Sequence, residues 1–306
     1  MDKKKIIFLL GATGIGKTTI ALSLAKKINA EIISCDSMQI YRKMNILTAK
    51  ATAKQRKKSR HHLLSILEPT VEYNVAQYRR DALKICAKLD SQGKIPLFVG
   101  GTGLYYSVIV DGLFPVLPQA KRIRERLEKL LRSKKSGYLY KKLVKVDPQA
   151  AGKIHPHDGR RIVRALEVYL QTGKPISFWQ KKRKGLGNEY EVKLLGLNLK
   201  RELLYKRIDL RVEKMFRLGL IKEVQKLLKL NLSKTAACAI GIPELKGYFN
   251  QEYNLDEAKR LLQRNSRHYA KRQLTWLRKD KRVKWININN ADTATAIAQR
   301  IYKLLN

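Results

Sequence analysis

The first part of the chain alternates short apolar runs with a helical pattern. One apolar run covers Lys5 to Leu10, and a second covers Glu31 to Cys35. Between them, after a glycine-rich segment, Ile20, Leu24 and Ile28 recur at helical spacing. Continuous apolar runs of this length are typical of strands that are buried on both faces of a parallel sheet. The pattern predicts a strand-helix-strand unit.

Three further apolar runs have the same character, at Ile95 to Val99, Val192 to Leu197 and Val283 to Ile288. Together with the first two runs they predict a parallel sheet of about five strands wrapped by helices, which is an α/β fold. The sequence from Arg201 to about Arg278 is helical in pattern and supplies some of those helices.

The segment between the third and fourth predicted strands is too long for a simple crossover. Its pattern is mostly helical, and it is bounded by Pro115 and Pro118 on one side and by Gly185 and Gly187 on the other. We expect residues 115–190 to form an inserted helical domain. Residues 1–114 and 191–306 then form the core domain with its C-terminal helices.

The chain is strongly basic, with 65 Lys and Arg against 25 Asp and Glu and a net charge of +40. Such a charge indicates a polyanionic partner such as nucleic acid, or else a general compositional bias, and the positions of the charges must decide. Cys35, Cys86 and Cys238 lie too far apart to predict a zinc site or a disulfide. Apolar stretches stay short of the roughly 18 residues that span a bilayer. We expect a cytoplasmic protein without membrane contact.

A phosphate-binding loop follows the first predicted strand, with the sequence GATGIGKT from Gly11 to Thr18. Its place between a strand and a helix is the context that this motif requires. The glycines let backbone N–H groups turn towards phosphate oxygens, and the helix N-terminus favours the negative charge. Lys17 is expected to neutralise the outer phosphate. The Thr18 hydroxyl suits a Mg²⁺ ion that bridges the same phosphates.

Asp36 ends the second predicted strand, at the edge of the sheet where open α/β folds bind their ligands. It is therefore expected to face the phosphate loop. We favour a role as general base over two alternatives, an outer-sphere magnesium ligand and a helix N-cap formed by Asp36 or Ser37.

Glycines follow the third predicted strand, where an ATPase often carries an acidic residue. Gly100, Gly101 and Gly103 either let a ligand approach the backbone, with Thr102 as a polar contact, or form a tight structural turn. His61 and His62 have no Cys or acidic partner at metal-binding spacing, which favours a structural role.

Basic residues gather in three segments. Lys259 to Lys284 holds eleven Lys and Arg against one acid, and Lys121 to Lys145 holds eleven against two. Within the former, four bases at helical spacing form a stripe beside Tyr269 and Trp276; they are Arg260, Arg264, Arg267 and Lys271. The third cluster places Arg160 and Arg164 on one helical face. Each could be a solvated surface, but beside a phosphate site the three together favour RNA binding.

Several blocks in this order resemble the bacterial tRNA dimethylallyltransferases over nearly the whole chain. The blocks are GATGIGKT, DSMQIY, ILTAK, HHLLSILEP, VGGTGLY, IHPHDGRRIVRALEVYLQTGKP, RIDLRVEKMFRLGLIKEV, AIGIPEL and NSRHYAKRQLTWLR. The chain departs from the common family residues at Ala12, where a Pro is usual, and at Leu47, where a Gly is common. The absence of a Cys/His finger after the core resembles the short bacterial form.

The resemblance implies transfer of a dimethylallyl group from dimethylallyl diphosphate to the N6 amine of the adenosine 3′ of the anticodon, in tRNAs reading codons that begin with U. It implies Mg²⁺ as cofactor, the tRNA anticodon stem-loop as partner, and a monomer. Asp36 would be the base, aided by Lys17 and Thr18. The diphosphate would be held by Gly11, Ala12, Thr13, Gly14, Ile15, Gly16, Lys17 and Thr18, with Arg207 and Arg211. The tRNA would meet Asp36, Ser37, Met38, Gln39, Thr102, Arg124, Arg160, Arg161, Ile162, Val163, Arg164, Arg264, Arg267 and Lys271.

Two other functions share parts of this pattern. The same loop occurs in ATP-dependent kinases and ATPases that act on nucleic acid, although the missing acid after Val99 disfavours that class. A basic RNA-binding module with a vestigial loop is the non-enzymatic alternative.

Overall fold

The computed structural model describes residues 4–114 and 120–305, and it divides the chain into two compact units. One unit comprises residues 1–110 and 186–306, and the other comprises residues 111–185. The second unit begins and ends a few residues before the insert expected from sequence, and strand β5 begins at Tyr190, which the sequence had placed in the insert. Pro115 and Pro118 lie outside the described residues.

The first unit is built on a sheet of six strands in the order β3-β2-β4-β1-β5-β6, with every neighbouring pair parallel. The strands are β1 (Lys4–Leu10), β2 (Ala30–Cys35), β3 (His61–His62), β4 (Ile95–Gly100), β5 (Tyr190–Asn198) and β6 (Lys284–Asn287). The predicted α/β fold and five predicted strands are confirmed. Strand β3 was not predicted, because two residues are too short to carry an apolar pattern.

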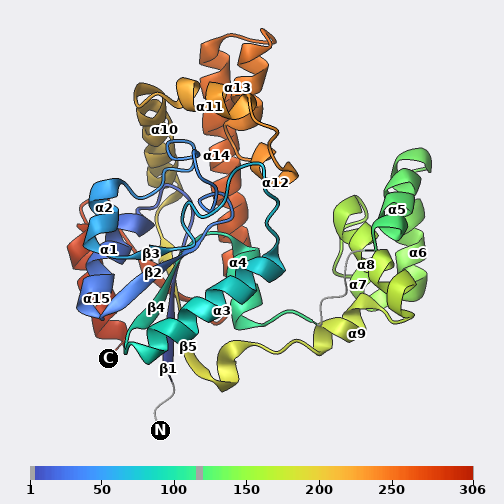
Figure 1. Ribbon diagram of the computed structural model, residues 1–306, viewed down its shortest axis with the longest axis horizontal. Helices are drawn as coiled ribbons and strands as arrows, with labels where there is room; N and C mark the ends of the chain where they lie inside the picture. Colours follow the sequence, from blue (N-terminus) through green and yellow to red (C-terminus); the bar gives the residue numbers. More distant parts are fainter. Residues whose placement is uncertain (1–3, 115–119, 306) are drawn as a thin grey trace. The chain divides into compact units, whose positions relative to one another are not determined.

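The residues of β1 point alternately to the two faces of the sheet, as the period of a strand requires. Ile7 and Leu9 pack in a core with helices α1 (Lys17–Lys27) and α15 (Ala294–Leu305). On the other face, the ring of Phe8 stacks on Phe98 with centroids 4.5 Å apart and meets Tyr106 of α4 (Gly103–Val110) edge-on. Helices therefore cover both faces of the sheet (Figure 1).

A group of helices follows β5 in the chain and brings distant segments to the sheet edge. They are α10 (Arg201–Arg217), α11 (Leu220–Leu228), α12 (Lys234–Ala237), α13 (Ile242–Phe249) and α14 (Leu255–Arg278). Asn254 is the N-cap residue of α14, and its side chain accepts a hydrogen bond from the Glu257 N–H at 2.9 Å. The first turn of the helix carries two acids. Its 24 residues run from this helical group down to the sheet (Figure 1). Helices α2 (Ala53–Lys58) and α3 (Val75–Ser91) complete the unit.

All regular secondary structure among the described residues of the second unit is helical. Its helices are α5 (Lys121–Ser133), α6 (Tyr138–Val146), α7 (Pro148–Ala151), α8 (Gly159–Thr172) and α9 (Ile176–Lys181). Leu127, Leu143 and Leu166 form part of its apolar core. None of the described helices in either unit has the length and apolar character needed to cross a membrane.

Candidate active site

The phosphate loop lies between β1 and α1 and depends on glycine backbone geometry. Gly14 and Gly16 have φ angles of 81° and 99°, in the left-handed region that other residues rarely adopt. A Cβ on Gly14 would also come within 2.8 Å of the Ile208 side chain on α10. Glycine at this position therefore allows both the turn of the loop and the close approach of α10.

Lys17 places a half-buried positive charge beside the loop. Its Nζ donates hydrogen bonds to the carbonyl oxygens of Gly11 at 2.9 Å and Ala12 at 2.8 Å. Burial lowers the pKa of Lys17 to about 8, while the carboxylate of Asp36 acts in the opposite direction. A partly desolvated ammonium group whose hydrogen-bond acceptors are neutral carbonyl oxygens favours the approach of an anion.

Arg211 of α10 brings a second cation to the same place. Its Nη1 donates to the Thr13 hydroxyl at 2.9 Å, and burial lowers the pKa of its guanidinium while Asp36 raises it. Arg207, one turn earlier, is directed elsewhere: it donates to Asn290 Oδ1 at 2.9 and 3.1 Å and to the Ile15 carbonyl at 3.4 Å. Both arginines were expected at the diphosphate. Arg211 lines the phosphate cavity, whereas Arg207 lies outside its wall and contacts the loop through the Ile15 carbonyl.

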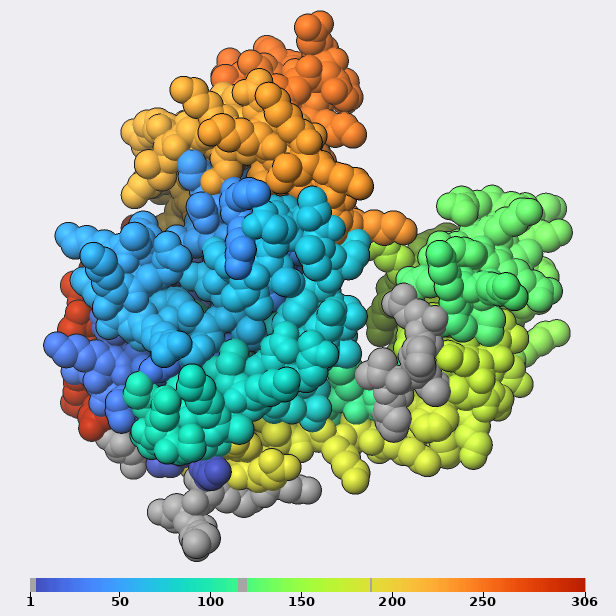
Figure 2. Space-filling model, viewed as in Figure 1, coloured from blue at the N-terminus to red at the C-terminus, as the bar shows by residue number. Residues whose placement is uncertain are grey.

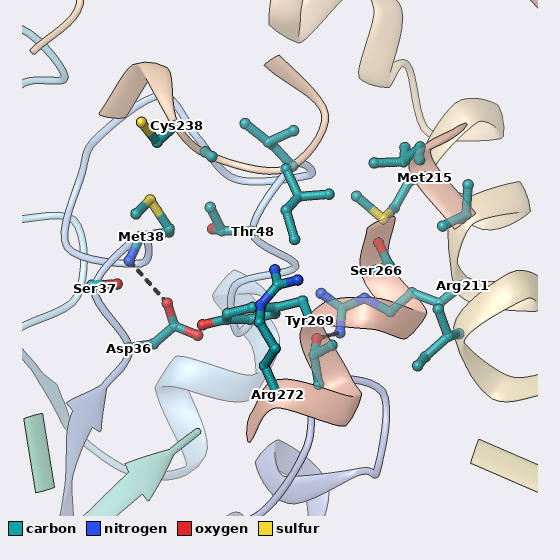
Figure 3. Close-up of a pocket in the computed structure, with 17 residues that line it drawn as sticks. Asp36, Ser37, Met38, Thr48, Arg211, Met215, Cys238, Ser266, Tyr269 and Arg272 are labelled. Atoms are coloured by element: carbon teal, nitrogen blue, oxygen red, sulfur yellow. Dashed lines mark hydrogen bonds between the residues drawn. The ribbon is translucent and has the colours of Figure 1, made fainter. Parts of the chain in front are cut away.

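Asp36 sits in the turn that follows β2. Its Oδ1 accepts hydrogen bonds from the N–H groups of Met38 at 2.9 Å and Gln39 at 3.4 Å. One carboxylate oxygen thus caps a turn, whereas the helix N-cap considered from sequence is not formed, because residues 37–40 are turns and no helix begins there. The second oxygen is directed into the site towards the hydroxyl of Tyr269 (Figure 3). Thr102 orders the same turn, because its Oγ1 accepts from the Ser37 N–H at 3.3 Å.

Two adjoining cavities meet at Asp36. The phosphate cavity, of about 240 Å³, contains the loop residues Gly14, Gly16, Lys17 and Thr18 in its wall. The apolar cavity, of about 250 Å³, is lined largely by aliphatic side chains from several segments, among them Leu47, Ile208, Val212, Met215, Ile240 and Leu262. Both walls share Thr13, Asp36, Thr48 and Arg211. A molecule with an anionic end and an apolar end can therefore occupy both cavities and pass Asp36.

Helix α14 contributes three side chains that the sequence did not assign to the site. The Oε1 of Gln273 accepts a hydrogen bond from the Thr13 N–H at 2.8 Å. Burial raises the pKa of Tyr269 to about 12, so its hydroxyl stays protonated, and Arg272 lies 5.7 Å from the centre of that ring. Tyr269 and Arg272 are directed into the apolar cavity (Figure 3). The sequence pattern of this helix predicted a basic stripe, but it did not predict that the neighbouring face lines the site.

The predicted basic stripe on α14 is partly neutralised within the protein. Arg260 pairs with Glu257 and Arg267 with Asp209, each at 2.6 Å. Arg264 and Lys271 are exposed. Nearby, Gly101 and Gly103 pack directly against Gln273 and Trp276, so that neither position has room for a side chain.

The arginines of the second unit that were expected to contact RNA differ in their exposure and in their partners. Arg160 and Arg161 are exposed at the start of α8. Arg124 and Arg164 lie 3.8 and 3.1 Å from one oxygen of the fully buried Glu167. Ile162 and Val163 are 1% exposed and lie in the core of the unit, so the expectation that their side chains meet RNA is corrected.

The two histidines differ in their surroundings. The Nε2 of His62 lies 2.7 Å from a carboxylate oxygen of Glu31, in agreement with the structural role expected from sequence. His61 lines the phosphate cavity and contacts the Ser59 carbonyl through Nδ1 at 2.8 Å. Its position in that wall was not predicted, because β3 itself was not.

The fold and the site define a phosphate-loop α/β protein in which two half-buried cations and one carboxylate line a polar cavity and an adjoining apolar cavity. The IPP transferase family model matches residues 39–280, and the isopentenyl transferase model matches residues 4–73. The chain belongs to the IPP transferase family.

Similar proteins are named in agreement with this family. The tRNA dimethylallyltransferase of Halothermothrix orenii is 44% identical, over 95% of this chain and 90% of its own. That of Thermosipho melanesiensis is 45% identical over 99% of both chains. A crystal structure of the Bacillus halodurans tRNA isopentenylpyrophosphate transferase is 37% identical, with a TM-score of 0.74 and 99% and 96% coverage. A eukaryotic dimethylallyltransferase acting on tRNA is 28% identical, with a TM-score of 0.82, over 97% of this chain and 77% of that one.

Proposed function

We propose that this protein transfers a dimethylallyl group from dimethylallyl diphosphate to the N6 amine of the adenosine 3′ of the anticodon, in tRNAs that read codons beginning with U. The single observation that carries the proposal is the position of Asp36, at the junction of the phosphate cavity and the apolar cavity. Family membership and the names of the relatives support the reaction class and disfavour the kinase alternative.

The donor matches the two cavities in chemistry. Its diphosphate suits the phosphate cavity, where Lys17 and Arg211 supply two half-buried positive charges and the loop supplies backbone N–H groups. Its prenyl group suits the aliphatic wall of the apolar cavity. This placement brings the carbon that reacts close to Asp36.

Asp36 then accepts the proton of the attacking amine. The N6 lone pair of adenine is delocalised into the ring, and it attacks efficiently only when a base removes the proton as the new bond forms. The C–N bond forms while the allylic C–O bond breaks, and the electron pair of that bond leaves with the diphosphate. Lys17 and Arg211 stabilise the charge that develops on the diphosphate.

The residues of the phosphate cavity fit a Mg²⁺ ion. The Thr18 hydroxyl lines this cavity together with the carboxylate of Asp36. Among the described residues there is no cluster of three or more His, Cys, Asp or Glu side chains that would form an all-protein metal cage. Mg²⁺ commonly binds through substrate phosphates, water and one or two protein oxygens, and when bound it would supply further positive charge to the diphosphate.

The inserted unit is proposed to bind the tRNA. Residues 111–185 contain twenty Lys and Arg against six Asp and Glu. Arg160 and Arg161 are exposed there, and Arg264 and Lys271 are exposed on α14. Such positive surfaces bind the phosphate backbone, and a firm grip on it offsets the cost of moving the target base out of its stack.

The test combines purified protein, Mg²⁺, dimethylallyl diphosphate and unmodified tRNA with adenosine 3′ of the anticodon. We expect a mass increase of one dimethylallyl group on that adenosine. Asp36→Asn keeps the size of the side chain and its capping oxygen, and it should lower kcat by about 10²–10⁴-fold with unchanged tRNA affinity. No transfer to any such tRNA would refute the function, and unchanged kcat would refute Asp36 as base. ATP hydrolysis unaffected by dimethylallyl diphosphate would revive the kinase class.

A further inference from the structure

We propose that Leu47 sets the length of the prenyl chain that the apolar cavity accepts. The inference rests on the proposed function and adds to it a residue that narrows the donor cavity of this chain, at a position where the family commonly has Gly. Leu47 lines the apolar cavity, and it is neighboured in the chain by Thr48, which lines both cavities. The segment that carries them is therefore in contact with both parts of the donor.

The backbone of this segment is anchored by one carboxylate. Residues 45–49 form turns between β2 and α2. Glu223 of α11 accepts hydrogen bonds from three successive N–H groups, those of Asn45 and Ile46 at 3.0 Å and that of Leu47 at 2.8 Å. Figure 2 shows the blue surface of this part of the chain lying directly beside the orange surface of the helical group. Hydrogen bonds to a charged acceptor are strong, so the position of Leu47 is well defined.

The side chain of Leu47 is held as closely as its backbone. It is 5% exposed and lies over Gly241, whose φ of +108° and missing Cβ leave space for the leucine methyl groups. Leu262 of α14 borders the same space, because its Cδ1 would lie 3.5 Å from a Cβ on Gly241. Leu47 therefore cannot swing outwards to admit a longer ligand without losing this packing.

Leu47 lies in a turn, whereas several other aliphatic residues of the cavity wall lie on long helices. Val212 and Met215 belong to α10 and Leu262 belongs to α14, so their positions are tied to the packing of long helices. A well-packed apolar wall rejects a larger ligand by steric exclusion, and removing part of one side chain relaxes that exclusion. Leu47→Ala removes three carbon atoms from the wall. The space that they leave accommodates a large part of the five-carbon unit by which geranyl diphosphate exceeds dimethylallyl diphosphate.

The experiment compares dimethylallyl and geranyl diphosphate as donors at saturating tRNA. The variants are Leu47→Ala, the milder Leu47→Val, and Leu64→Ala as a matched control, since Leu64 is buried but lies outside both cavity walls. We expect Leu47→Ala to raise the ratio of kcat/KM for geranyl over dimethylallyl diphosphate by about tenfold or more. Leu47→Val should shift the ratio less in the same direction, and Leu64→Ala should keep the wild-type ratio.

An unchanged donor ratio in folded Leu47→Ala would overturn the proposal, as would a change confined to the KM for tRNA. Thermal unfolding of each variant checks the folded state, and if Leu47→Ala does not fold, an unchanged ratio in Leu47→Val overturns the proposal. Failure of the proposed function has a separate signature, because the wild-type protein would then transfer neither prenyl group.

Discussion

Three ionisable side chains define the chemistry of the site at the scale of single residues. Lys17 and Arg211 are half-buried cations, and the carboxylate of Asp36 raises the pKa of each. Their net positive charge is unfavourable inside a protein unless an anion joins them. The side chains are thus arranged for a diphosphate before it binds, which is how preorganised electrostatic stabilisation works.

The lowered pKa of Lys17 predicts how donor use depends on pH. In the free protein, Lys17 carries its proton below pH of about 8 and loses it above. The diphosphate binds the protonated form, so kcat/KM for dimethylallyl diphosphate should be level below this pH and fall by about tenfold per unit above it. Steady-state rates between pH 6 and about pH 10 measure this. Lys17→Arg should lower the level but remove the decline, and a flat wild-type profile through this range contradicts the assignment.

At the scale of elements, α14 connects the helical group to the phosphate loop. Gln273 is 5% exposed and accepts the hydrogen bond of the Thr13 N–H from 260 positions away in the chain. Tyr269, one turn earlier, faces the carboxylate of Asp36 (Figure 3). A single helix therefore orders the loop and lines the cavity that adjoins it.

Removing the Gln273 acceptor should weaken the loop. Gln273→Leu keeps the side-chain volume but leaves the Thr13 N–H without its partner, at a cost of about 1–3 kcal/mol in the free energy of unfolding. Urea denaturation measures that loss, and the KM for dimethylallyl diphosphate should rise in parallel. Gln225→Leu, on the exposed face of α11, is the control. Equal stability of the two variants would contradict the role of Gln273.

At the scale of the whole molecule, the excess of positive charge is divided between the two units. The net charge of +40 includes twenty Lys and Arg and only six acids in residues 111–185. The donor cavities lie entirely within the other unit. Binding of tRNA and binding of donor should therefore respond to different substitutions. The predicted monomeric state stays a prediction that light scattering can test.

Charge reversal on the inserted unit should affect tRNA alone. Arg160→Glu should raise the KM for tRNA and reduce the salt dependence of tRNA binding by about one unit of slope, because one phosphate contact is lost. The KM for dimethylallyl diphosphate should stay unchanged. The control is Lys27→Glu, which makes the same charge change at an exposed position of α1. Similar effects of both variants on tRNA would show that net charge, and not the site of Arg160, governs binding.

The local pattern of the sequence determined the elements and the chemical groups on them. Apolar runs predicted β1, β2, β4, β5 and β6. The inner strands are apolar because helices cover both faces of the sheet, and the edge strand β6 contributes buried Ile286. The glycine-rich motif predicted the phosphate loop, and strand direction placed Asp36 at the correct sheet edge. These features depend on neighbours in the chain, so they are visible in sequence.

Only the tertiary structure decided which side chains converge. Arg211 reaches Thr13 and Arg207 does not, although both lie on one helix. Gln273 lies on a helix whose sequence pattern predicted only a basic stripe, so its hydrogen bond with the Thr13 N–H was not predicted. The apolar cavity is assembled from segments as distant as Leu47 and Leu262. Its shape follows from the packing of helices against one another, which no local periodicity records, because contacts between distant segments are set by the whole fold.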